Sequence, residues 1–156
     1  RLVFSSVISS VILALMMGIV AFFGFTITSI PPFLLLVFTT LVASMALSVL
    51  IFALFILMGK EYAFLSWTFL QLVIMLSAPF FPIEIYPVPI QYIAKLLPHT
   101  WVFKAVKALA STGSVPLIDV YIGLAIAVLA LILVFPFYLW VFKKSRKNGK
   151  LVRLGF

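Results

Sequence analysis

The sequence predicts an all-α protein: a polytopic bundle of transmembrane helices with a re-entrant or interfacial helical hairpin at its outer surface. Of its 156 residues, 66% are apolar and only 9% are charged, whereas soluble domains carry roughly 25% charged residues. Three stretches contain no Asp, Glu, Lys or Arg, and each is long enough to cross a bilayer. They are residues 2–59, 62–83 and 120–142. Five of the nine prolines fall between Pro79 and Pro98, where they exclude one continuous helix.

The predicted transmembrane domain covers residues 1–142 and contains four spans. They cover about residues 2–25, 32–58, 62–78 and 117–142. Tandem prolines at Pro31 and Pro32 separate the first two, because proline cannot continue a helix but can begin one. Lys60 and Glu61 form a short polar break, and Pro136 predicts a kink in the last span. The chain begins at Arg1 within an apolar run, so we expect a piece of a longer protein.

Residues 79–114 form the predicted hairpin. It should contain two short helices, over about 90–97 and 101–111, with Thr100 as a cap of the second. Glu84 and Asp119 flank it. We expect Glu84 to pair with a hairpin lysine.

Residues 143–156 form a predicted basic cytoplasmic tail with six cations and no acid. Placing this tail in the cytoplasm puts eight cations inside and three outside, as the bias of Lys and Arg towards cytoplasmic loops requires. We therefore expect a multi-pass protein of the cell membrane with a cytoplasmic C-terminus. The formal charge of +8 lies mainly beside a span, so anionic lipid is the expected partner of the tail rather than nucleic acid.

Small and hydroxyl-bearing residues recur every four positions on two predicted spans. On the first span the hydroxyl residues are Ser6 and Ser10, followed by Ala14 and Gly18. Such a stripe lets another helix approach closely, or it could line a substrate path, and the sequence does not separate these alternatives. On the second and third spans, the candidates for helix packing or for lining such a path are Thr40, Ser44, Ser48 and Gln71. Gln71 should hydrogen-bond to a neighbouring helix, because an unpaired amide in lipid is costly.

The sequence contains no pattern typical of catalysis. It has no cysteine and a single histidine, His99, which has no second ligand at metal-binding spacing. It also lacks a glycine-rich phosphate loop, a hydrolase elbow and paired carboxylates. We therefore expect no enzyme activity, no metal and no cofactor in this chain.

A series of short motifs occurs between the last two predicted spans. They are Ser77, Phe81-Pro82, Pro87, Pro89, Gln91-Tyr92-Ile93-Ala94 and Leu97-Pro98-His99-Thr100. In their order and spacing they resemble the end of the permease subunit of type-two ABC exporters. Two positions depart from that pattern: Ala78, where glycine is usual, and Lys107, near a frequent arginine.

The resemblance implies that the chain supplies roughly the last four of six spans of an ATP-driven exporter. It implies a second permease subunit, identical or different, and a cytoplasmic ATP-binding cassette subunit that hydrolyses ATP. The spans would form the translocation path, and the hairpin would form an outer gate. The candidate gate residues are Ser77, Phe81, Pro82, Glu84 and Pro98. The alternative is a non-transporting membrane scaffold or assembly subunit, and the substrate stays open.

Overall fold

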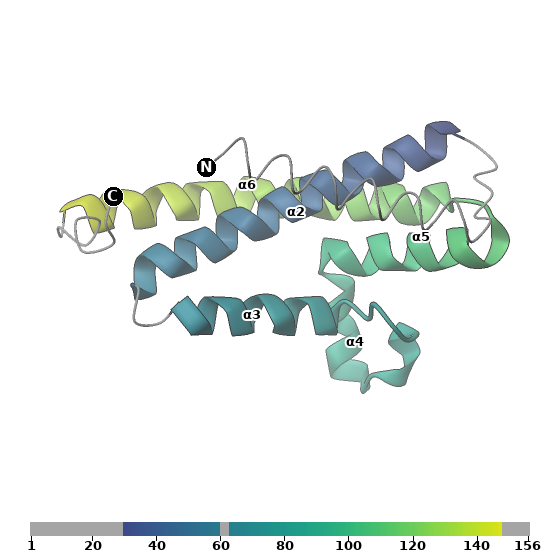
Figure 1. Ribbon diagram of the computed structural model, residues 1–156, viewed down its shortest axis with the longest axis horizontal. Helices are drawn as coiled ribbons and strands as arrows, with labels where there is room; N and C mark the ends of the chain where they lie inside the picture. The colour runs from purple at the N-terminus through teal and green to yellow at the C-terminus, as the bar shows by residue number, and fades with distance from the viewer. Residues whose placement is uncertain (1–29, 60–62, 148–156) are drawn as a thin grey trace, which may run out of the picture.

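The computed structural model describes residues 30–59 and 63–147. Within these residues the protein is all-α, as predicted. It has five α-helices and one short 3₁₀ helix (Figure 1). They are α2 (Ile30–Met58), α3 (Ala63–Leu76), η2 (Ile83–Ile85), α4 (Val88–Lys95), α5 (Pro98–Thr112) and α6 (Leu117–Lys147). The predicted first span, with Ser6 and Ser10, and the tail beyond residue 147 lie outside the described residues.

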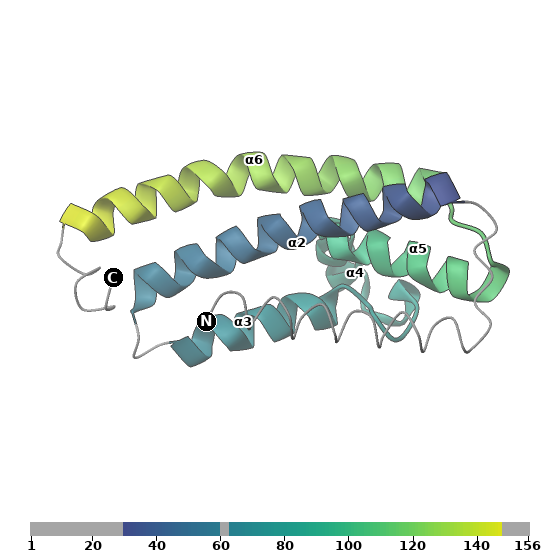
Figure 2. The same cartoon turned by 45° about the horizontal axis from the view of Figure 1, so that its top comes forward.

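The two long helices, α2 and α6, lie side by side and run in the same direction (Figures 1 and 2). They contain 29 and 31 residues, and both are long and apolar enough to cross a membrane. α6 continues five residues beyond the predicted end of the last span, to Lys147. Pro136 lies inside α6, which Figure 2 shows as one continuous, gently curved ribbon, so this proline does not divide the helix.

Helices α3 and α5 run opposite to the long helices and follow one another along them (Figure 1). α3 lies against α2, whereas α5 lies against both α6 and α2. With 14 and 15 residues, each is about 21 Å long, short of the roughly 30 Å hydrocarbon core. That residues 62–78 cross the membrane alone therefore stays a prediction. Whether the hairpin is re-entrant or interfacial likewise stays a prediction.

Helix α3 ends at a strained turn that other elements hold in place. Ser77 is fully buried and donates from Oγ to the Val73 carbonyl over 2.8 Å. Ala78 follows with a φ of 52°, the left-handed region that favours glycine. The Lys107 ammonium of α5 donates to the carbonyls of Ala78 and Phe81 over 2.8 and 2.9 Å. These two bonds satisfy carbonyl groups of the turn that follows α3.

The hairpin helices begin and end at other residues than predicted, and the proposed Thr100 cap is wrong. Leu97 is the N-cap of α5, and Pro98 occupies its first turn, where a missing N–H costs nothing. The helix therefore starts three residues earlier than expected. Thr100 lies inside it, and its hydroxyl donates to the Ala94 carbonyl of α4 over 2.6 Å.

The tightest junction lies where α2, α5 and α6 meet. A Cβ added at Gly123 of α6 would lie 3.0 Å from the Trp101 Cβ of α5 and 3.5 Å from the Thr39 methyl of α2. Thr39 is fully buried, and its hydroxyl donates to the Leu35 carbonyl over 2.9 Å. An apolar cluster from the same three helices packs at this junction. It comprises Leu36, Val102, Ala105, Leu109 and Val120.

Candidate functional site

A groove of about 690 Å³ opens between α2, α3 and α5. Its volume lies within the range of 300–1,000 Å³ typical of small-molecule sites. Several turns of α2 contribute to its lining, together with residues of α3 and of the first turns of α5. The lining residues are Thr40, Ser44, Leu47, Ser48, Ile51, Phe52, Phe55, Ser66, Trp67, Leu70, Ile74, His99, Val102 and Phe103.

The hydroxyl stripe predicted on the second span lines this groove. Thr40, Ser44 and Ser48 are four residues apart, so they lie on one side of α2, and all three belong to the lining. The Thr40 hydroxyl already donates to the Leu36 carbonyl over 2.8 Å. Ser44 and Ser48 are exposed, and neither hydroxyl makes a hydrogen bond to another described residue. Two donors on this wall are therefore available to a ligand.

Ser66 of α3 adds a further hydroxyl-bearing residue to the lining. Its exposed fraction is only 4%, and its Oγ is buried without a hydrogen-bond partner among the described residues. Buried polar atoms are nearly always hydrogen-bonded, so each exception calls for an explanation. The sequence analysis did not single out Ser66. The available signal was a hydroxyl within an otherwise apolar stretch.

His99 contributes the remaining polar group. It sits in the first turn of α5, outside the two long helices, and faces the groove beside Val102 and Phe103. Burial lowers the pKa of His99 below its ordinary value near 6.5, because a less hydrated site disfavours the charged imidazolium. The neutral ring has one donor and one acceptor. No group of three or more His, Asp or Glu side chains within residues 30–59 and 63–147 could hold a metal ion.

The other lining residues that the structure describes are all apolar. Four of them are aromatic, namely Phe52, Phe55, Trp67 and Phe103. Aromatic side chains offer large rigid surfaces to an apolar ligand. An apolar groove with a few polar groups is the usual form of a small-molecule site.

Gln71 lies apart from this groove. Its side chain is exposed, and it makes no hydrogen bond to another described residue. The predicted bond to a neighbouring helix is therefore not formed within the described part of the chain. An exposed amide on α3 points away from the packed elements.

The candidate gate residues gather in the hairpin rather than in the groove lining. Ser77 and Pro98 are buried, Phe81 is half-buried, and Pro82 and Glu84 are exposed. The Phe81 and Tyr86 rings meet edge to face with their centroids 5.7 Å apart. Tyr86 also donates its hydroxyl to the Met75 carbonyl at the end of α3. The hairpin is thus fastened to α3 by Tyr86 and Lys107.

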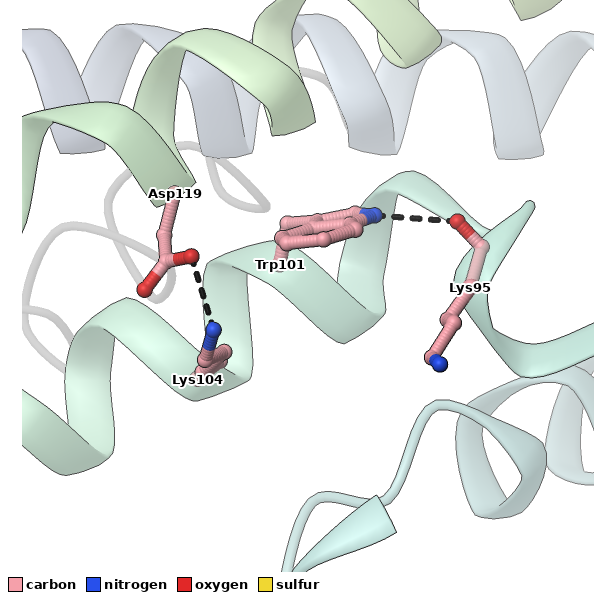
Figure 3. Close-up of polar contacts among 4 residues, drawn as sticks. All are labelled: Lys95, Trp101, Lys104 and Asp119. Atoms are coloured by element: carbon pink, nitrogen blue, oxygen red, sulfur yellow. Dashed lines mark hydrogen bonds and ion pairs between the residues drawn. The ribbon is translucent and has the colours of Figure 1, made fainter. Parts of the chain in front are cut away.

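The ion pair of the hairpin differs from the predicted one. Lys104 of α5 donates to an Asp119 carboxylate oxygen of α6 over 2.8 Å (Figure 3). Glu84 makes no ion pair with a described residue, so its predicted pairing with a hairpin lysine is wrong. The tertiary arrangement brings Asp119 within reach because α5 turns directly into α6.

Trp101 joins the two hairpin helices beside this ion pair. Its indole N–H donates to the Lys95 carbonyl over 2.9 Å (Figure 3). The Lys104 ammonium lies 5.3 Å from the centre of the Trp101 ring, close enough for a cation–π attraction. The bonds from Trp101 and Thr100 hold α4 against α5.

The fold and the groove define a class: an all-α protein with two helices long and apolar enough to cross a membrane and a ligand-sized groove beside one of them. No protein-family model matches the chain, and neither curated proteins nor solved structures include a match.

Proposed function

We propose that the chain is the membrane-spanning permease part of an ATP-driven ABC exporter. The observation that carries the proposal is the groove lined by Thr40, Ser44 and Ser48 on a helix of membrane-crossing length. The motifs from Ser77 to Thr100 that resemble exporter permeases form the elements that end α3 and begin α5. Groove and motifs thus adjoin in space.

In this proposal the groove is part of the translocation path and the hairpin is its outer gate. A gate needs two conformations that differ in affinity for the substrate. Lys107 and Tyr86 fasten the end of α3 to the hairpin, so α4, α5 and the turn after α3 would move as one unit. Such a movement would open or close the groove at His99, which belongs to α5.

The proposal requires partners that this chain does not supply. A second permease subunit, identical or different, would complete the path, and a cytoplasmic ATP-binding cassette subunit would hydrolyse ATP. The end of α6 carries Lys143, Lys144, Arg146 and Lys147, which suit the anionic inner surface of a cell membrane. The Lys144 ammonium lies 4.8 Å from the centre of the Trp140 ring, and tryptophan favours the membrane–water interface.

Co-purification from membranes tests this function. We expect the full chain to co-purify with an ATP-binding cassette protein encoded beside its gene, and the complex to hydrolyse ATP. A Ser48→Trp change, which fills the groove, should alter the ATPase rate at least severalfold, whereas Thr68→Trp on the exposed side of α3 should not. Isolation of the chain without any ATP-binding protein would instead support the scaffold alternative.

A further inference from the structure

We propose that the groove binds an uncharged, lipid-like amphiphile, whose polar group is held by the hydroxyls of Ser66, Ser44 and Ser48. This inference rests on the proposed function, because it names the class of substrate taken by the same groove. It starts from Ser66, a lining residue whose hydroxyl is buried and has no hydrogen-bond partner in the described part of the chain.

The described lining residues favour an uncharged ligand. Among the described residues that line the groove, none is acidic or basic at neutral pH, and a charged group placed beside them would lose its hydration without gaining a counter-charge. Of the lining residues that the structure describes, His99 alone is titratable, and burial holds it towards its neutral form. The nearest ion pair of the hairpin, between Lys104 and Asp119, is already satisfied.

The distribution of polar and apolar residues in the lining favours an amphiphilic ligand. Hydroxyl-bearing residues of two helices, α2 and α3, line one groove whose other described lining residues, apart from His99, are aliphatic and aromatic. A molecule with a hydroxyl or carbonyl head and an apolar body satisfies both features at once. A strongly polar molecule such as a free sugar would leave most of its groups unpaired, which is costly in an apolar site.

Photo-crosslinking of the purified full chain in nanodiscs tests this inference. The probe is a photoactivatable diacylglycerol, and photoactivatable phosphatidylserine serves as the anionic comparison. We expect saturable labelling of α2 and α3 peptides by the neutral probe. Excess unlabelled diacylglycerol should compete at least tenfold better than phosphatidylserine.

Two variants of Ser66 separate the hydroxyl from the space around it. Ser66→Ala should weaken binding of the neutral probe about tenfold, as expected for one buried hydrogen bond, and Ser66→Leu should abolish saturable labelling. Thr68→Leu is the matched control, because Thr68 lies on the same helix outside the groove and its hydroxyl already bonds the Phe64 carbonyl. Its labelling should equal that of the wild type.

Three results would overturn the inference: equal labelling of wild type and Ser66→Leu, equal competition by the anionic lipid, or no saturable labelling because another segment of this chain fills the groove. The proposed function is tested separately. Neutral-probe binding without an ATPase partner would leave this inference standing and refute the exporter. ATP-driven activity without groove labelling would support the exporter and refute this inference.

Discussion

At the scale of single residues, the turn after α3 depends on Ala78 and Lys107. Ala78 is buried with an exposed fraction of 2% and has a φ of 52°. The left-handed conformation costs a non-glycine residue roughly 1–2 kcal/mol. The glycine that the resembling family usually has there would avoid this cost. Backbone conformation, rather than space for packing, is thus the reason why this position favours glycine.

Substitutions at Ala78 test this explanation. Ala78→Gly removes the conformational cost but loses a buried methyl group worth about 0.8 kcal/mol and adds backbone entropy to the unfolded chain. We expect its free energy of unfolding to change by less than about 1 kcal/mol. Ala78→Val should lower it by more than about 2 kcal/mol, because a β-branched residue is poorly tolerated at positive φ. Unfolding in detergent micelles measures both, and equal values would contradict the explanation.

Lys107 and Lys104 allow a matched comparison on one helix. Lys107→Met removes two charge-assisted hydrogen bonds to the carbonyls of Ala78 and Phe81, so we expect a loss of about 2–3 kcal/mol in unfolding free energy. Lys104→Met breaks an ion pair whose lysine is 58% exposed, which should cost less than about 1 kcal/mol. Chemical denaturation of the two variants checks the order, and a larger effect at Lys104 would refute it.

His99 predicts a dependence of stability on pH. Its pKa is lower in the folded protein than in the unfolded chain, so the unfolded chain binds more protons as the pH falls below about 6.5. The folded state should therefore be most stable above that pH and lose stability as acid is added. In the His99→Asn variant, the thermal unfolding midpoint should depend less on pH between roughly pH 7.5 and 5.5. If the midpoint of this variant changes with pH as steeply as that of the wild type, His99 is not the source of the pH dependence.

At the scale of elements, the contact between α5 and α6 depends on a glycine. A Cβ at Gly123 would lie 3.0 Å from the Trp101 Cβ, so Trp101 would have to shift to admit a side chain, and Trp101 is itself held by its bond to Lys95. This close approach is what lets α5 lie along the long helices instead of outside them.

Enlarging Gly123 tests the contact. Gly123→Val should lower the unfolding free energy by about 1–3 kcal/mol or more, because the nearest atom is a Cβ that cannot move independently of its backbone. Ala125→Val, at an exposed position of the same helix, should change it by less than about 0.5 kcal/mol. Thermal unfolding in detergent compares the pair. Equal stability of the two variants would show that α5 does not pack as closely as the structure indicates.

At the scale of the whole molecule, parallel α2 and α6 place the loop before α6 and the basic end of α6 at opposite ends of the bundle (Figure 2). The chain contains no cysteine, so single cysteines can report on each end. In intact cells a membrane-impermeant maleimide should label Ser114→Cys, whereas Lys147→Cys should react only after permeabilisation. The reverse pattern would overturn the proposed orientation, and reaction of both in intact cells would refute a membrane-crossing α6.

The sequence by itself determined the helical class, the two long apolar helices and the hydroxyl stripe of Thr40, Ser44 and Ser48. These features follow from local composition and from the period of the α-helix, which a sequence displays directly. Tertiary structure alone decided that the stripe lines the same groove as Ser66 and His99, that Asp119 rather than Glu84 pairs with Lys104, and that Lys107 holds the turn at Ala78. Each of these contacts joins residues from different helices, and their meeting depends on packing at Gly123 and on backbone turns that periodicity does not encode.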